Sequence, residues 1–147
     1  MDDPFDLERF ILAQQVSYPQ ACAELAAGRK ASHWMWFIFP QLAGLGASAI
    51  SRRFALTSLE EARAYLAHAV LGPRLRECTR LANAIEGRSA RQIFGAPDDV
   101  KFRSSMTLFA LAAPDEPLYA EALRKYFGEE PDVRTLELLG LRRPQAP

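Results

Sequence analysis

A short polar run in the second half of the sequence is well suited to bind an anion. Helical spacing places Asp98, Lys101 and Ser105 along one stripe, with Ser104 beside them. Lys101 is one of only three lysines in the chain, and an ammonium group beside two hydroxyls suits a phosphate or a carboxylate. Amides near Asp98, at the start of the expected helix, would add further donors. We therefore predict an anion site that contains Asp98, Asp99, Lys101, Ser104 and Ser105.

The same run also allows a simpler interpretation. Asp98 and Lys101 are three positions apart, so on a helix they can form a solvated ion pair without any ligand. Two acidic residues would also offset a cation in the early turns of a helix, where the macrodipole disfavours it. The sequence leaves both the ion pair and the anion site open.

Both tryptophans of the chain lie in one aromatic segment, Ser32–Gln41. On a helix Trp34 and Trp36 point about 200° apart, so one can anchor the core while the other faces a cavity. We predict that His33, Trp34, Trp36 and Gln41 contribute to the same pocket, with Trp36 stacking on a planar part of a nucleotide-like ligand. In the alternative, the segment is a core helix and His33 is a satisfied cap residue.

Helical signals run along the chain that must position these side chains. No segment alternates apolar and polar residues with a period of two, and no Asn-Gly or Asp-Gly pair marks a hairpin. We therefore predict a compact all-α fold with about seven to nine helices and no significant sheet. The expected N-caps are Asp6, Ser32, Ser58, Ser89 and Asp132.

Proline and glycine mark where the helices are expected to break. Tyr18-Pro19 should separate a first helix from a second one. Gly44 and Gly46 should keep residues 41–48 in a loop. Glu61 should complete a capping box with Ser58. Apolar stripes at helical spacing predict a core that includes Phe10, Leu75, Phe102, Met106 and Phe109.

The composition limits the class of protein. Eighteen basic and eighteen acidic residues cancel, which argues against nucleic-acid binding through net charge alone. The longest apolar run, Trp34–Phe39, is far shorter than the about 20 residues that a membrane helix needs, so no membrane partner is expected. A length of 147 residues predicts one domain over 1–147, with its core at about 5–140 and a short tail at 141–147.

Cysteine and histidine give no sign of a metal site. Cys22 and Cys78 lack a C-x-x-C spacing, and the two histidines, His33 and His68, do not form an H-E-x-x-H motif. We expect no metal, no cofactor and no disulfide, which is typical of a cytoplasmic protein. His68 is expected to cap a helix end.

Several long motifs resemble a family of bacterial and fungal proteins, the domain of unknown function 1810, which is sometimes labelled calpastatin-like. The resemblance covers about residues 5–140 and implies a compact all-helical fold, but no particular activity. Calpain inhibitors are disordered repeats, and this chain contains no repeat. The motifs that carry the resemblance are Gly28-Arg29-Lys30, Ser32–Gln41, Gly44-Leu45-Gly46, Leu71–Leu75, Phe94-Gly95, Pro97-Asp98-Asp99, Lys101 and Ser104–Phe109.

A looser pattern is similar to the family that removes ADP-ribose from bases by N-glycosidic hydrolysis. It consists of His68-x-x-Leu71, Phe94-Gly95 and Lys101. Two hypotheses follow from the sequence. In the first, the chain binds a small anionic or nucleotide-like ligand in one aromatic and polar pocket, as a binder or as such a hydrolase. In the second, it is a non-catalytic structural or interaction module whose Trp/Phe segment is only core.

Overall fold

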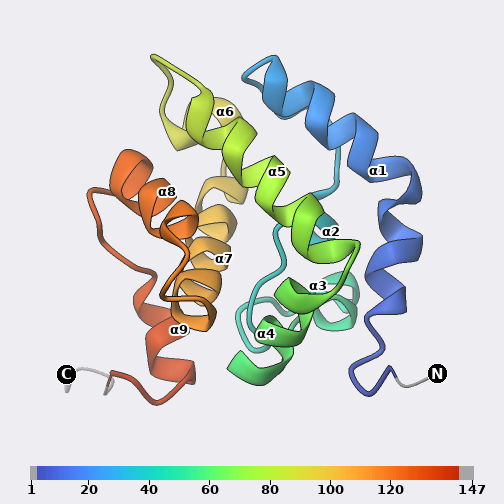
Figure 1. Cartoon of the computed structure of the whole chain (residues 1–147). Helices are drawn as coiled ribbons and strands as arrows, with labels where there is room; N and C mark the ends of the chain where they lie inside the picture. The colour runs from blue at the N-terminus through green and yellow to red at the C-terminus, as the bar shows by residue number, and fades with distance from the viewer. Residues whose placement is uncertain (1–2, 143–147) are drawn as a thin grey trace.

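Helices joined by short loops make up the computed structural model, which describes residues 3–142 (Figure 1). No strand occurs among these residues, so the all-α prediction is confirmed. Most of the expected tail, residues 143–147, lies outside them. The helices of the described chain are α1 (Glu8–Ala26), α2 (Met35–Ile38), α3 (Ala49–Arg53), α4 (Leu59–Ala67), α5 (Leu71–Ala84), α6 (Ala90–Phe94), α7 (Asp98–Ala112), α8 (Pro117–Phe127) and α9 (Val133–Leu138).

Helix α1 is longer than predicted, because Pro19 lies inside it and does not end it. The predicted break at Tyr18-Pro19 is therefore wrong. A proline within a helix deprives the carbonyl four residues earlier of its backbone donor. Here that carbonyl belongs to Gln15, and both Gln15 and Pro19 are exposed, so water can take the donor's place.

The start of α1 is capped by Asp3 and not by Asp6. The two carboxylate oxygens of Asp3 accept hydrogen bonds from the amides of Leu7 and Glu8, at 2.8 and 3.0 Å. Asp6 instead has a positive φ of 50° in the turn before the helix. The predicted cap is wrong because the turn brings a more distant carboxylate onto the free amides, and such a turn leaves no periodic signal in the sequence.

Three other caps follow the prediction. The side chains of Ser58, Ser89 and Asp132 each accept a hydrogen bond from an amide in the first turn of α4, α6 and α9. Glu61 does not complete the predicted capping box, since its carboxylate accepts a 2.8 Å hydrogen bond from the amide of Thr57. The reciprocal box forms at the start of α6, between Ser89 and Gln92.

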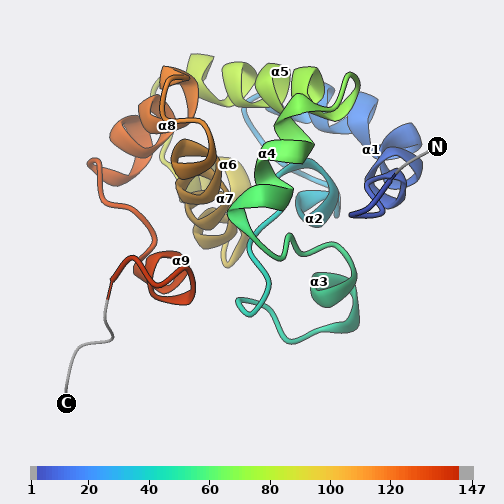
Figure 2. The same ribbon diagram turned by 60° about the horizontal axis from the view of Figure 1, so that its bottom comes forward.

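Helix α7 lies in the middle of the fold and packs against α2, α4, α6, α8 and α9. Figure 2 shows α5 crossing above α4 and α2, with α1 and α8 on either side. The expected core residues are each no more than 1% exposed, so that prediction is confirmed: Phe10, Leu75, Phe102, Met106 and Phe109.

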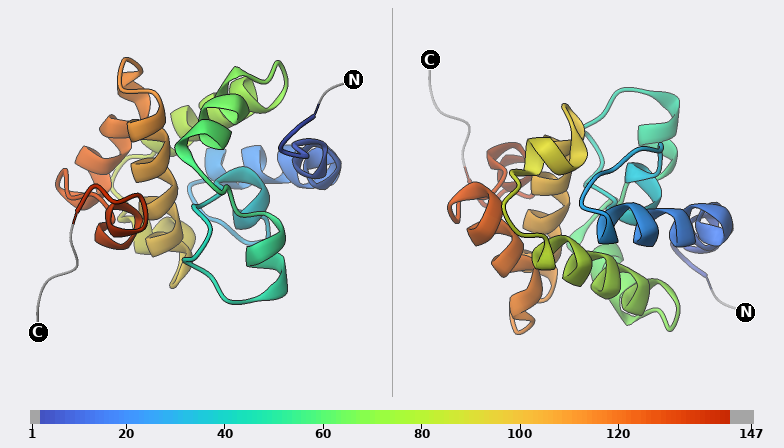
Figure 3. Two further views of the ribbon diagram at one scale, coloured as in Figure 1. Left: turned by 90° about the horizontal axis from the view of Figure 1, so that it is seen from below. Right: turned by 90° about the horizontal axis from the view of Figure 1, so that it is seen from above.

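The segment between α2 and α4 contains a short helix, α3, which the sequence analysis did not predict. Hydrogen bonds between Leu56 and the backbone of Gln41 and Ala43, at 2.9 and 2.7 Å, hold the two ends of this segment together. Figure 3 shows α3 on the flank of the molecule beside α1, away from α8. Among the described residues, no helix has the length and apolar character that a bilayer span requires.

Candidate functional site

A cleft of about 250 Å³ opens where the start of α7 faces the loop after α2 and the start of α9. We call it the α7–α9 cleft. Three of the predicted site residues line it: Gln41, Lys101 and Ser104. The full lining consists of Gln41, Leu45, Gly46, Pro97, Val100, Lys101, Ser104, Asp132 and Arg134.

Two side chains of this cleft are cationic: Arg134, which is unpaired, and Lys101, which pairs with Asp98 outside the lining at 3.4 Å. The one carboxylate of the cleft lining belongs to Asp132. It caps α9 by accepting hydrogen bonds from the amide and the hydroxyl of Thr135, at 2.9 and 2.6 Å. Arg134 is exposed, and no described residue forms an ion pair or a side-chain hydrogen bond with it. The lining therefore carries the positive charges of Lys101 and Arg134 and the negative charge of Asp132, which gives it a formal net charge of +1.

Lys101 is held in place by two neighbours. Its Nζ lies 3.4 Å from Oδ1 of Asp98 and 5.0 Å from the centroid of the Trp36 ring. The predicted alternative, an ion pair between Asp98 and Lys101, is thus present. A cation over an indole face gains electrostatic attraction from the ring quadrupole. The ammonium group covers one face of Trp36, so this tryptophan positions Lys101 in the structure.

A second lysine, Lys30, shares the same carboxylate. Its Nζ lies 2.8 Å from Oδ2 of Asp98, and its side chain is only 6% exposed. Two ammonium groups therefore flank one carboxylate, which leaves a net positive charge across the three residues. The sequence-based prediction did not include Lys30, although Lys30 is another of the chain's three lysines.

Three backbone amides at the start of α7 are already satisfied. The amide of Asp99 donates to the Gly95 carbonyl at 2.8 Å, and those of Val100 and Lys101 donate to the Pro97 carbonyl at 3.1 and 3.2 Å. These amides have no donor left for a ligand. The expectation that amides near Asp98 would hold an anion therefore does not apply to those of Asp99, Val100 and Lys101.

The two predicted serines lie at different depths. Ser104 is 3% exposed and lines the cleft, and its hydroxyl donates to the Val100 carbonyl at 3.1 Å, so its lone pairs are open to a donor. Ser105 is fully buried outside the lining, and its Oγ has no partner among the described residues. The same holds for Nε1 of Trp36. Both orphaned groups lie on helices that pack together, α2 and α7.

Six predicted residues do not line the cleft: Trp36, Asp98 and Ser105, described above, and His33, Trp34 and Asp99. His33 is exposed in the segment before α2. Trp34 is 1% exposed and belongs to the core. Asp99 is half-buried, and its Oδ1 accepts a 2.9 Å hydrogen bond from the amide of Val100.

Glu24 organises the segment that carries Lys30. Its carboxylate accepts hydrogen bonds from the amides of Ala31 and Ser32, the Ser32 hydroxyl and Nε1 of Trp34, at 2.6 to 2.9 Å. Burial acts to raise the pKa of Glu24, but these hydrogen bonds outweigh it and lower the pKa to about 2. Ser32 therefore bonds to Glu24 and does not cap α2, whose N-cap is Trp34. The predicted cap at Ser32 is wrong because a distant carboxylate binds its hydroxyl.

The residues that sequence reasoning missed come from distant parts of the chain. Arg134 belongs to the short helix α9 and reaches the cleft only through the packing of α9 on α7. A hydrogen bond of 2.8 Å from the Asp132 amide to Oγ1 of Thr107 fixes that packing. No local motif marks such a residue. Among the described residues, no cluster of three or more His, Cys, Asp or Glu side chains could hold a metal ion.

Comparisons with known proteins agree with the resemblance seen in the sequence. The family described as "Protein of unknown function (DUF1810)" matches residues 4–139. The crystal structure of a conserved hypothetical protein from Mycobacterium tuberculosis is similar, with a TM-score of 0.93 and 54% sequence identity. The match covers 95% of this chain and 100% of that one. No protein with a curated description matches. The chain belongs to the DUF1810 family.

Proposed function

We propose that the α7–α9 cleft binds a small compound through a phosphate or carboxylate group. The observation that carries this proposal is the pair of cationic side chains, Lys101 and Arg134, in a lining that holds one carboxylate. The cleft's own carboxylate, on Asp132, is already used as a helix cap. Charge-assisted hydrogen bonds from ammonium and guanidinium groups are the strongest that proteins offer to such anions.

The surroundings of the cleft support binding of the charged end of a ligand. Asp98 and Trp36 hold Lys101, so little side-chain freedom would be lost when an anion arrives. Gln41 and Ser104 supply neutral polar groups. A volume of about 250 Å³ is smaller than the roughly 300–1,000 Å³ typical of whole-ligand pockets. A nucleotide-like ligand would therefore place a phosphate in the cleft and leave the rest outside it.

Calorimetric titration tests this binding with two probes, pyrophosphate and ADP-ribose. Lys101→Met and Arg134→Met should each weaken binding by about tenfold or more, because each removes a charge-assisted contact. Arg124→Met is the matched control, since Arg124 is an exposed arginine of α8. The proposal would be refuted if the Lys101 and Arg134 variants bound the two probes as tightly as the wild type does. It would also be refuted if the wild type bound neither probe.

A more specific function that we propose for this cleft is the hydrolysis of ADP-ribosyl N-glycosidic bonds. Water would cleave the bond between the anomeric carbon and the base nitrogen. The carbon would take the hydroxide, and the departing nitrogen would take the proton. Asp98, the carboxylate that pairs with Lys101 next to the cleft, would orient that water. This activity rests on the loose sequence pattern and on the position of Asp98. Release of ADP-ribose from an oligonucleotide that carries an ADP-ribosylated base, lost in Asp98→Asn, would support it; no release by the wild type would refute it.

One observation favours the second candidate function, a non-catalytic module. Four residues of the aromatic segment, Trp34, Met35, Ile38 and Phe39, are at most 1% exposed. This part of the segment has the burial expected of a core element and offers no surface to a ligand. The two functions are distinguished by the titrations, because a module would show no response to either probe.

A further inference from the structure

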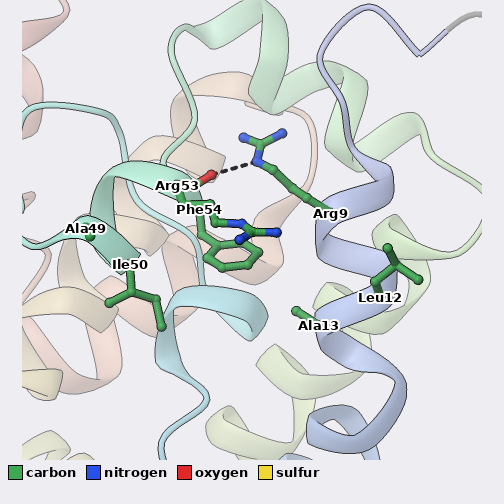
Figure 4. A pocket seen from close by; sticks show the side chains of 7 residues that line it. All are labelled: Arg9, Leu12, Ala13, Ala49, Ile50, Arg53 and Phe54. Atoms are coloured by element: carbon green, nitrogen blue, oxygen red, sulfur yellow. Dashed lines mark hydrogen bonds between the residues drawn. The ribbon is translucent and has the colours of Figure 1, made fainter.

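A second hollow, larger than the first, lies between α1 and α3. It has a volume of about 590 Å³, and its seven lining residues come from these two helices and the residue that follows α3. Figure 4 shows Arg9, Leu12 and Ala13 on one side and Ala49, Ile50, Arg53 and Phe54 on the other. We call it the α1–α3 groove. It shares no lining residue with the α7–α9 cleft.

Of the two arginines in the groove, Arg9 is fully engaged within the protein. Its guanidinium donates to the carbonyls of Arg53, Phe5, Asp6 and Ala55 at 2.6 to 3.0 Å. It also donates to the Glu61 carboxylate at 3.2 Å. Arg9 therefore forms a wall of the groove and ties α1 to the end of α3, as the dashed line in Figure 4 shows. It has little capacity left for a ligand.

Arg53 is the available cation. Its Cζ lies 5.6 Å from the centroid of the Phe54 ring, and Figure 4 shows the side chain extended across that ring towards α1. No carboxylate of the described residues lies within ion-pair distance of it. A guanidinium in this state presents a planar fork of donors that matches a carboxylate. The side chain lies over Phe54 at the boundary between this groove and a neighbouring hollow, which Arg53 also lines.

The remaining walls are apolar. Leu12, Ala13, Ala49, Ile50 and Phe54 complete the lining, and Leu12 is 58% exposed at the side that α1 contributes. An exposed leucine gives up contact with water when an apolar chain covers it. The groove thus combines a continuous apolar surface with one unpaired positive charge and no unpaired negative one.

We propose that the α1–α3 groove binds a small amphiphilic carboxylate, with the carboxylate on Arg53 and the aliphatic chain against Leu12, Ile50 and Phe54. Charge complementarity selects an anionic head, and the apolar walls select the chain. The size of the groove selects a small molecule over a protein: a stable protein interface uses about 20–30 residues on each side, whereas seven residues line this groove. Its volume lies within the roughly 300–1,000 Å³ of small-molecule pockets.

Calorimetry with decanoate, decanol and decylammonium, below their micelle concentrations, tests the proposal. We expect decanoate to bind at one site per chain, and to bind at least about tenfold more tightly than decanol or decylammonium. Arg53→Met should remove that preference and keep the apolar contact. The neighbouring Arg52→Met should not, because Arg52 is exposed on the same helix outside the groove.

Two further variants test the apolar walls. Leu12→Ser should weaken decanoate binding severalfold, whereas Val16→Ser, one turn further along α1 and also exposed, should leave it unchanged. The proposal is overturned if decanoate and decanol bind equally, if Arg53→Met binds decanoate as the wild type does, or if no saturable binding occurs. It is also overturned if sedimentation shows a dimer that Ala49→Trp dissociates, because a second copy would then occupy the groove.

Discussion

Lys30 and Asp98 form an ion pair, with 2.8 Å between Nζ and Oδ2, that ties the segment before α2 to the first turn of α7. The two residues lie far apart in the sequence, and Lys30 is almost completely buried. The amide of Lys30 adds a 2.7 Å hydrogen bond to the Ile93 carbonyl at the end of α6. The position of Asp98, and through it that of Lys101, therefore depends on a segment outside α7.

We predict that Lys30→Met lowers the free energy of unfolding by about 1–3 kcal/mol, because it leaves the partly buried Asp98 with a weaker partner. Lys125→Met is the matched control. Lys125 pairs at 3.4 Å with Glu86, whose side chain is 88% exposed, and such exposed pairs contribute about 0–1 kcal/mol. Urea denaturation of both variants measures the difference, and equal losses would show that the Lys30–Asp98 pair is only a surface contact.

The carboxylate of Glu24 should make stability depend on pH. Its pKa of about 2 in the folded protein lies below its ordinary value of 4.5. Its stabilising contribution is therefore complete above pH 4.5 and is lost as the pH falls from there towards 2. Because the group is partly exposed, we expect about 1–2 kcal/mol. Urea midpoints of the wild type and Glu24→Gln should differ most near neutral pH and converge in acid; a constant gap would contradict this assignment.

Phe109 should be among the most costly core residues to truncate. It is fully buried, with its ring centroid 5.6 Å from that of Tyr65 and 5.8 Å from that of Tyr119. We expect Phe109→Ala to cost about 3–5 kcal/mol. Val100→Ala on the same helix should cost far less, since Val100 is 54% exposed. Thermal and urea unfolding measure both losses, and a midpoint unchanged in Phe109→Ala would contradict the packing.

Gly72 should not tolerate a side chain. A Cβ at this position would lie 2.1 Å from the Leu66 carbonyl oxygen, a backbone atom that cannot move aside easily. We expect Gly72→Ala to cost at least about 1–3 kcal/mol, as overpacking does. Gly87→Ala is the control: its φ of +74° strains an alanine, but no atom lies within 4 Å of the added Cβ. Gly72→Ala should unfold at the lower urea concentration of the two; the reverse order would contradict the close approach.

Local signals accounted for most of the fold. The helix starts at Ser58, Ser89 and Asp132 depend on a side chain and an amide three residues later, and such short-range chemistry is visible in the sequence. The burial of Phe102 and Phe109 follows from the periodicity of α7. Predictions of helix caps from local sequence are wrong where a distant side chain takes the same hydrogen bond.

Glu24 takes the hydroxyl of Ser32, and Asp3 takes the first amides of α1, so the predicted caps at Ser32 and Asp6 do not form. In the candidate site, too, local periodicity predicts some residues and tertiary packing brings in others. The stripe on α7 placed Lys101 and Ser104 together, but Lys30 and Arg134 reach it only through tertiary packing.

The central claim, that the α7–α9 cleft holds a small anion, is tested most directly by locating one. Tungstate is a tetrahedral oxyanion whose anomalous scattering identifies its position without ambiguity. In crystals soaked with tungstate, we predict a peak between the Lys101 ammonium and the Arg134 guanidinium, absent from identically soaked crystals of Lys101→Met. An empty cleft, with tungstate bound only elsewhere or not at all, would contradict the claim.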